Sequence, residues 1–404
     1  MKFYVEAYGC TMNQGETEMI AESLEREGHV RVDSPENADK ALIGTCVVIK
    51  KTEERMKRRI EELRNRCSEV VIAGCLSSTR KKEVQERCPD ADFIPPSDVE
   101  FTVGAMNSAT DSTIGTVPIS SGCLGDCSYC ITKLARGTIK SRQVEDIKER
   151  FKNLLSNSVK EIRLTSQDSA LYGKDISTDL VELLKELLEI ETDYRIRIGM
   201  MNVDTLRPIK SGFMDVMEDE RIYNFVHLPL QSGSNDVLKK MNRNYTVEEW
   251  KRTAEEFRDR FPDISISTDV IVGFPGETDD DFEKTKDAVK EIEPDIINVT
   301  RFSPREGTEA AEMDDQVHSS VKKKRSKEMT DLRFKISRKI NETYVGRDTE
   351  IFVLEEGKGD SLKGRMDNYK VVILKNEDAE ILGERKEVKI KSAEDVYLLG
   401  ESIT

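Results

Sequence analysis

Six of the eight cysteines in this chain form two groups of three, and cysteine thiolates are the usual ligands of iron–sulfur clusters. Cys123, Cys127 and Cys130 have the spacing C-x3-C-x2-C and directly follow a predicted strand. Three thiolates on one short loop can hold three corners of a cubane cluster. A zinc knuckle would need a fourth cysteine or histidine nearby, and none follows. The spacing of this loop triplet therefore indicates iron–sulfur chemistry.

The N-terminal triplet consists of Cys10, Cys46 and Cys75, each of which directly follows a predicted strand. The carboxyl ends of parallel strands meet at one edge of a sheet, so three thiolates could converge there and leave one iron of a four-iron cluster open. The alternative is that these are small buried residues, because cysteine is among the most buried types. Cys67 and Cys88 precede strands at the opposite edge, and we expect structural thiols or a disulfide there.

The composition restricts the classes of protein to consider. The chain has 404 residues, enough for two or three domains, and a net charge of −15. That charge excludes a polycation that binds nucleic acid by bulk charge, and three histidines disfavour imidazole-based triads and zinc sites. No apolar run is long enough to span a bilayer, and the start lacks the layout of a signal peptide. We expect a cytoplasmic protein with reduced cysteines and no membrane partner.

The first hundred residues alternate between apolar strands and charged helices, which predicts an open parallel sheet. The predicted strands are 2–8, 40–45 and 69–74, and the predicted helices run from 16 to 27, from 52 to 66 and up to residue 87.

The segment VPISSGCLGDCSYC, with Tyr129 just before its last cysteine, resembles the motif of the radical S-adenosylmethionine (SAM) enzymes. The resemblance implies a 4Fe-4S cluster on the loop triplet whose fourth iron chelates the amino and carboxyl groups of SAM. One-electron reduction then cleaves SAM to a 5′-deoxyadenosyl radical.

Six predicted strands alternate with helices around and after this motif, which fits the partial (β/α)6 barrel expected of the resembling family. In β/α barrels the chemistry lies at the carboxyl ends of the strands. The strands are 117–121, 161–166, 194–200, 224–230, 264–274 and 295–302, with helices such as 180–190 and 247–261. The resemblance implies SAM contacts from Tyr129, Gln167, Asp168, Asn202 and Gln231, with the backbone of Val272 and Gly273 beside the adenine.

Two cysteine triplets in this order resemble those of the methylthiotransferases, radical SAM enzymes with a preceding cluster domain. The resemblance covers essentially the whole chain and implies two 4Fe-4S clusters. Gly44 departs from the pattern, because many members have Asn there, and this affects only a local turn. The matching stretches include YGCTMNQGETE (8–18), TCVV (45–48), AGCLSS (73–78), HLPLQSGS (227–234), STDVIVGFPGET (267–278) and RFSPREGTEAA (301–311).

Members of this family modify one of three substrates: adenosine 37 of tRNA with an isopentenyl group, the same adenosine with a threonylcarbamoyl group, or an aspartate of a ribosomal protein. The segments 123–137 and 165–175 are most similar to the archaeal and eukaryotic threonylcarbamoyladenosine enzymes, and Lys133 stands where bacterial tRNA enzymes typically have Pro. We therefore expect methylthio transfer to C2 of N6-threonylcarbamoyladenosine at position 37 of tRNA. The cysteines serve as ligands, so no catalytic side chain is assigned.

Several alternatives remain open at this point: the other two substrates, a radical SAM carbon methyltransferase whose N-terminal triplet is merely structural, and a non-catalytic iron–sulfur RNA-binding protein. The implied partners of the favoured enzyme are tRNA and an electron donor such as ferredoxin or flavodoxin.

The region from residue 341 onward is rich in β-strand residues and resembles a TRAM domain, a small barrel that binds RNA as OB-like folds do. The specific part of the match is Gly364, Arg365, Asn368 and Tyr369. This tail has 10 basic and 15 acidic residues, which fits poorly with phosphate contacts. We expect three domains: 1–108 with the N-terminal triplet, 109–340 as the radical SAM domain, and 341–404 as the TRAM-like domain.

Basic residues concentrate in two segments, 132–142 and 321–340, and the second is predicted to be a helix that links the barrel to the tail. Such a run is commonly a solvated face. Because both runs flank the expected site, we expect RNA contacts from them. The candidates are Lys133, Arg136, Arg142, Lys322, Lys323, Lys324, Arg325 and, in the tail, Arg365.

Overall fold

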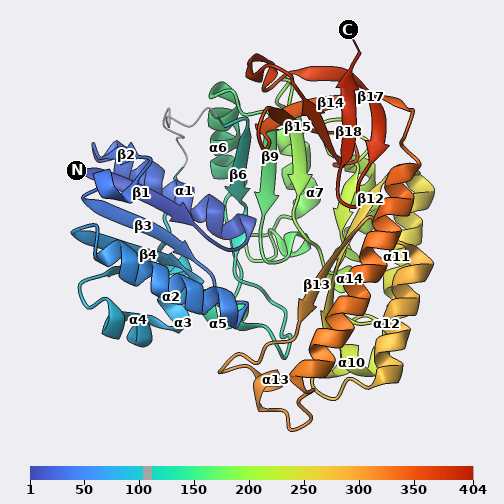
Figure 1. The fold of residues 1–404 in the computed structure, drawn as a ribbon, viewed down its shortest axis with the longest axis horizontal. Helices are drawn as coiled ribbons and strands as arrows, with labels where there is room; N and C mark the ends of the chain where they lie inside the picture. The colour runs from blue at the N-terminus through green and yellow to red at the C-terminus, as the bar shows by residue number, and fades with distance from the viewer. Residues whose placement is uncertain (103–111, 404) are drawn as a thin grey trace.

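The computed structural model describes residues 1–102 and 112–403, and it has the predicted α/β architecture in three parts (Figure 1). An N-terminal parallel sheet is followed by an open barrel of parallel strands and then by a small closed β-barrel. The domain boundary expected after residue 108 lies outside the described residues. The boundary expected after residue 340 falls near the end of the continuous helix α14 (Ser319–Glu342), which links the open barrel to the closed one.

The N-terminal sheet has five parallel strands in the order β2-β1-β3-β4-β5. The three predicted strands are its centre, and two short edge strands were missed. Helix α1 begins at Thr11, earlier than predicted, because Gly9 has a positive φ and turns the chain directly from β1 into the helix. The elements are β1 (Lys2–Ala7), α1 (Thr11–Arg26), β2 (Val30–Val32), β3 (Lys40–Thr45), α2 (Lys50–Arg64), β4 (Glu69–Gly74), α3 (Cys75–Thr79), α4 (Lys81–Arg87) and β5 (Asp92–Ile94).

The eight cysteines are all free thiols, so the alternative of a disulfide between Cys67 and Cys88 is not realised. Both side chains are buried in the apolar core of the N-terminal sheet, together with Ile60 and Val70. Their prediction as structural thiols is consistent with this position.

The second part is the predicted partial (β/α)6 barrel. Its strands pair in parallel in two groups, β6-β9-β10 and β11-β12-β13, and a parallel bridge between Ile196 and Ile222 joins the groups. Among the described residues no pairing joins β6 to β13, so the barrel stays open on that side. The strands are β6 (Ile114–Pro118), β9 (Glu161–Thr165), β10 (Arg195–Ile198), β11 (Phe225–His227), β12 (Ser265–Val272) and β13 (Ile296–Arg301).

Helices pack on the outside of this barrel, and α11, α12 and α14 form a layer beside β12 and β13 (Figure 1). They begin with side-chain caps, for example Thr246 and Thr278, each of which forms a capping box with an acidic residue three positions on. The main helices are α6 (Val144–Ser156), α7 (Leu180–Leu188), α9 (Lys210–Val216), α10 (Asn235–Lys240), α11 (Val247–Arg260) and α12 (Asp279–Ile292). No helix in the described part of the chain is long and apolar enough to cross a bilayer.

The two faces of the barrel strands differ in chemistry. Alternate strand residues such as Ile162, Ile196 and Ile266 belong to the apolar core shared with the helices. The residues between them, which point to the inside of the barrel, include Arg163 and Arg197. In an ordinary β/α barrel the interior is packed with branched apolar side chains. In this open barrel some of the inner positions are instead occupied by charged side chains.

The third part is a closed barrel with strand order β14-β15-β16-β18-β17, as expected for the tail. Its core contains Val353, Leu374, Val388 and Leu398. The strands are β14 (Asp348–Glu356), β15 (Ser361–Arg365), β16 (Val371–Lys375), β17 (Arg385–Ala393) and β18 (Leu398–Ser402).

The turn between β15 and β16 packs against the open barrel, at the amino ends of its strands. Asp367 pairs with Arg195 at 2.7 Å, and the Asn368 amide donates to the carbonyl oxygen of Asp263 at 3.1 Å. The ring of Tyr369 lies 4.9 Å from that of Tyr223, and its hydroxyl donates to Glu161. The segment 364–369, which carries the resemblance to a TRAM domain, therefore holds the closed barrel against the open barrel.

Replacing Tyr369 by alanine should destabilise the contact between the two barrels by about 3 kcal/mol, since the change removes a partly buried ring from an aromatic cluster. Denaturant unfolding and limited proteolysis of the tail measure this effect. Tyr369→Phe is the matched control, because it keeps the ring and loses only the hydroxyl. Wild-type stability of Tyr369→Ala would contradict the docking role.

Candidate functional site

The N-terminal triplet lies at the carboxyl ends of three adjacent strands, as predicted. Cys10 caps α1 after β1, Cys46 follows β3, and Cys75 is the first residue of α3 after β4. A Cβ on Gly9 would lie only 2.7 Å from the Cβ of Cys46, so a glycine before Cys10 allows the two segments to approach. The sheet topology thus brings together thiols that are far apart in the sequence.

A buried cation lies beside these thiols. Arg136 donates to Asn13 at 2.6 Å, and the Cys75 thiol lies 3.8 Å from the same Asn13 oxygen. Burial raises the pKa of Cys75 to about 12, while the charge of Arg136 acts in the opposite direction. Without a metal the thiol therefore stays protonated, and metal binding would displace its proton.

The chemistry of the donor set, three thiols with a guanidinium beside them, fits an iron–sulfur cluster. A cubane takes one thiolate on each iron, so its ligands stand further apart than those of a mononuclear site. Three thiols with a neighbouring guanidinium, which offsets the negative charge of thiolates, suit such a cluster.

The loop triplet lies between β7 (Ser120–Ser121) and α5 (Ile131–Arg136). Gly122 turns the chain into this loop with a positive φ, and a Cβ there would lie 2.1 Å from the carbonyl oxygen of Thr138. The amide of Gly125 donates to the Cys123 sulfur at 3.2 Å, and Cys130 is the N-cap residue of α5. Burial raises the pKa of Cys123 to about 11. A metal that bound the Cys123 thiol would therefore displace its proton.

Arg243 belongs to this site, and sequence reasoning missed it. Its guanidinium donates to the Cys127 sulfur at 3.2 Å and to the side-chain oxygen of Asn202, and it lies over the ring of Tyr245. Burial raises the pKa of Cys127, and the charge of Arg243 opposes that rise. Arg243 follows α10 rather than a strand end, and nothing in its local sequence distinguishes it from a surface arginine.

Three of the predicted SAM contacts surround the loop triplet. The Gln167 side chain accepts a bond from the Gly122 amide at 2.6 Å. Asp168 is buried and accepts bonds from Asn202 at 2.7 Å and Thr205 at 2.8 Å, and burial raises its pKa to about 6. These side chains therefore form a connected polar shell around the cysteine loop.

The other predicted SAM contacts lie further around the rim. Tyr129 packs edge-on against Phe274 with ring centres 6.2 Å apart. Gln231 is buried in a left-handed conformation, and its side-chain oxygen has no hydrogen-bond partner among the described residues. The Val272 carbonyl and the Gly273 amide are already paired, with Phe302 and Glu277 respectively. Their assignment to SAM remains a prediction.

Two of the predicted RNA contacts need correction. Arg136 is fully buried and forms an ion pair with Glu16 at 2.6 Å. Arg325 is buried and pairs with Glu277 at 2.6 Å and with Asp279 at 2.7 Å. Neither guanidinium is accessible to a phosphate, because each charge is neutralised inside the protein.

The remaining basic candidates differ in exposure. Arg142 donates to the Val99 carbonyl, Lys322 packs over the Phe302 ring, and Arg365 lies over the Tyr369 ring. Lys133 is partly exposed and pairs with Asp126 at 2.8 Å. Lys323 and Lys324 are exposed on α14. RNA contact by these six residues remains a prediction.

A chain of polar side chains crosses three neighbouring strands inside the barrel. His227 on β11 lies 2.9 Å from Asp269 on β12, and Asn298 on β13 donates to the other oxygen of Asp269 at 2.9 Å. Burial opposes ionisation of Asp269, but His227 and Asn298 hold its pKa below the usual value. Sequence reasoning included the His227 segment only as a family match.

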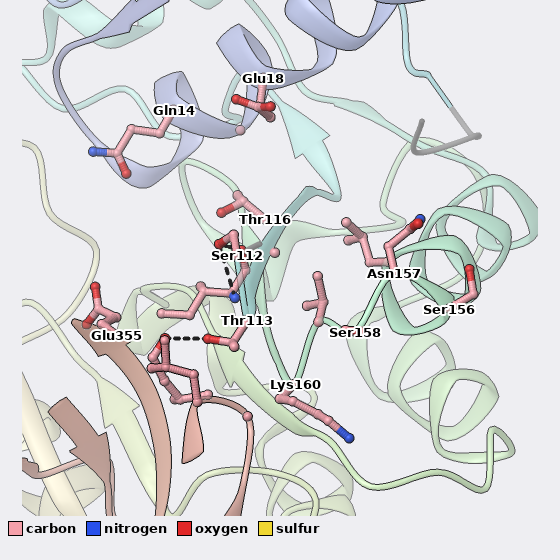
Figure 2. A pocket seen from close by; sticks show the side chains of 18 of the residues that line it. Gln14, Glu18, Ser112, Thr113, Thr116, Ser156, Asn157, Ser158, Lys160 and Glu355 are labelled. Carbon is pink, nitrogen blue, oxygen red and sulfur yellow. Dashed lines mark hydrogen bonds between the residues drawn. The ribbon is translucent and has the colours of Figure 1, made fainter. Parts of the chain in front are cut away.

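A cavity of about 1240 Å³ lies elsewhere (Figure 2). It is bounded by α1, β6, the end of α6 and the closed barrel, and Gln14, Glu18, Asn157 and Glu355 line it. None of the eight cysteines lines it, so it is separate from the site described above.

Comparison with known families divides the chain into the same three parts as the fold. The profile of the Radical SAM superfamily matches residues 117–289, and that of the TRAM domain matches residues 342–403. A family described as uncharacterized protein family UPF0004 matches residues 2–95.

Curated relatives align over the full length. A probable threonylcarbamoyladenosine tRNA methylthiotransferase of Methanocaldococcus jannaschii is 39% identical over 100% of this chain and 97% of its own. A tRNA-2-methylthio-N(6)-dimethylallyladenosine synthase of Thermosipho africanus is 34% identical over 100% and 99%. Among solved structures, the radical SAM methyltransferase TsrM of Kitasatospora setae has a TM-score of 0.58 at 14% identity, over 77% of each chain, which supports the fold alone.

Proposed function

The chain belongs to the radical SAM methylthiotransferases, and on that premise we propose that each of its two cysteine triplets holds a 4Fe-4S cluster. The enzyme transfers a methylthio group to C2 of N6-threonylcarbamoyladenosine at position 37 of tRNA. Full-length relatives are named threonylcarbamoyladenosine tRNA methylthiotransferases. The observation that carries the two-cluster proposal is the convergence of Cys10, Cys46 and Cys75 at three adjacent strand ends beside a buried arginine.

The reaction explains why the site contains ligands and no nucleophile. The C2–H bond of adenine has no acidity that a side-chain base could use near neutral pH. The clusters and SAM supply one-electron and sulfur-transfer chemistry when bound, and the protein supplies position and electrostatics. The thiols would release their protons on binding the clusters. Arg136 would offset the negative charge of the N-terminal triplet, and Arg243 that of the loop triplet. Gln167 fixes the start of the cysteine loop by accepting a hydrogen bond from the Gly122 amide.

We propose in addition that the enzyme binds tRNA, receives electrons from a donor protein and works in the cytoplasm. A ferredoxin or flavodoxin is the class of donor that such chemistry requires. Exposed Lys323 and Lys324 on α14, with Lys133 beside the cysteine loop, are the basic residues best placed to contact a tRNA backbone.

Mass analysis of tRNA nucleosides from a strain that lacks this gene tests the function. We expect the methylthio form of threonylcarbamoyladenosine to disappear and its unmethylthiolated precursor to accumulate. Disappearance of methylthio-isopentenyladenosine instead, or of a methylthio group on a ribosomal protein, would contradict the substrate assignment. Expression of the chain from a plasmid should restore the modified nucleoside.

Replacing Arg243 by glutamine should weaken retention of the loop-triplet cluster about 10- to 100-fold, the usual cost of losing a group that supports a metal ligand. The change removes the cation that donates to Cys127 at 3.2 Å. The iron lost to a chelator over time and the cluster potential measure the effect, with an expected shift to more negative potential. Arg243→Lys keeps the charge and should recover part of the loss, whereas wild-type retention in Arg243→Gln would contradict the role.

A further inference from the structure

Two arginines lie side by side on the inner face of the open barrel. Arg163 on β9 and Arg197 on β10 are direct partners in the parallel register, so their side chains leave the sheet on the same face. Arg365, at the end of β15, reaches the same region from the closed barrel, since both it and Arg197 lie over the ring of Tyr369. Two guanidinium groups thus lie over one tyrosine ring, and Arg163 stands beside Arg197 on the neighbouring strand.

The carboxylates nearby do not neutralise this group. Glu161 accepts bonds from Arg163 at 2.6 Å and from the Tyr223 hydroxyl at 2.9 Å. Glu355 lies 3.5 Å from Arg365. Three arginines against two glutamates leave one positive charge, and it falls on Arg197, which forms no ion pair with any residue that the structure describes.

Arg197 has aromatic neighbours instead of an acidic one. Its guanidinium lies 5.1 Å from the centre of the Phe225 ring and 5.8 Å from that of Tyr369. Burial lowers its pKa, and the neighbouring charges of Arg163 and Arg365 add to that effect. An anion that entered the barrel would pair with this guanidinium and stabilise its charge.

There is space beside this group for part of a ligand. A cavity of about 190 Å³ lies between β13, α14 and the closed barrel, and Arg365, Tyr369 and Asn298 are among its lining residues. Asn298 also donates to Asp269 on the inner face of the barrel. The cavity and the interior of the barrel therefore share residues.

The chemistry of the substrate provides a matching anion. A threonylcarbamoyl group ends in a carboxylate, whereas an isopentenyl group is uncharged and unmodified adenosine has no substituent at all. A guanidinium binds a carboxylate through two parallel hydrogen bonds. The substituent leaves adenine from N6, so it can occupy a part of the barrel away from C2. We propose that Arg197, supported by Arg163, binds the carboxylate of the threonylcarbamoyl group and so selects this tRNA substrate. The proposal rests on the proposed function.

Affinity of the anaerobic holoenzyme for an anticodon stem-loop RNA tests this assignment. The probes carry N6-threonylcarbamoyladenosine, its methyl ester or unmodified adenosine at position 37. We expect the acid to bind about 10- to 100-fold more tightly than the other two, as for a charge-assisted pair. Arg197→Gln should remove this preference for the acid, and Arg197→Lys should restore part of it. Arg252→Gln, at an exposed position on α11, is the control.

Equal binding of acid and ester by the wild-type protein would overturn the assignment, and that comparison needs no variant to fold. A full preference for the acid in Arg197→Gln would overturn it as well. Failure of the proposed function is seen separately, as absence of the methylthio nucleoside when the wild-type enzyme acts on the acid-bearing RNA.

Discussion

Replacement of Cys10, Cys46 and Cys75 together by alanine should abolish methylthio transfer while SAM cleavage continues. The three thiols converge at the ends of β1, β3 and β4, on a different part of the chain from the loop triplet. If each triplet holds its own cluster, removing one leaves the other intact. The expected loss is complete for the methylthio product and small for 5′-deoxyadenosine.

Two measurements check this result: mass analysis of the tRNA nucleosides, and chromatography of 5′-deoxyadenosine formed anaerobically from SAM. Iron should fall from about eight to about four atoms per chain, because each cubane contains four. The matched control is the double replacement of Cys67 and Cys88 by alanine, which removes two buried thiols of the same sheet that lie away from the triplet. Methylthio transfer that survives the triple replacement would contradict the assignment of the N-terminal triplet.

The same variants separate the alternative enzyme classes. A carbon methyltransferase with a structural N-terminal triplet would contain about four irons in the wild-type chain and would lose none on the triple replacement. A non-catalytic RNA-binding protein would form no 5′-deoxyadenosine. Both outcomes are distinct from the one expected here.

The positions of the cysteines were predictable from sequence because the backbone topology determines them. A residue directly after a parallel strand lies at one edge of the sheet whatever its side chain does, so Cys10, Cys46 and Cys75 could be placed together. The polar strand-end segment that contains Gln167 and Asp168 followed from the same rule.

The long charged side chains could not be placed in this way. Arg136 and Arg325 stand in basic segments, yet their partners Glu16 and Glu277 lie far away in the sequence and take both guanidinium groups into the interior. Arg365 faces Tyr369 for a similar reason, since the turn after β15 docks on the open barrel instead of facing solvent. A local excess of charge does not reveal which charges a distant segment will neutralise.

Helix α1 depends on two such distant pairs for its position against the open barrel. Arg136 of α5 pairs with Glu16, and Arg150 of α6 pairs with Glu22 through two bonds of 2.7 and 3.0 Å. All four side chains are buried. Since Cys10 caps this helix, the two pairs also set where the N-terminal triplet lies relative to the loop triplet.

Replacing Glu22 by alanine should therefore destabilise the protein by about 3–5 kcal/mol, because it leaves the Arg150 guanidinium buried without its carboxylate. Denaturant unfolding measures the loss. Glu18→Ala on the same helix is the matched control: its pair with Arg31 is partly exposed, and its removal should cost less than about 1 kcal/mol. Equal stability of the two variants would show that the buried pair does not hold α1 in place. Replacing Glu22 and Arg150 together by leucine and methionine should recover most of the loss, since a buried pair contributes little beyond the cost of leaving one partner alone.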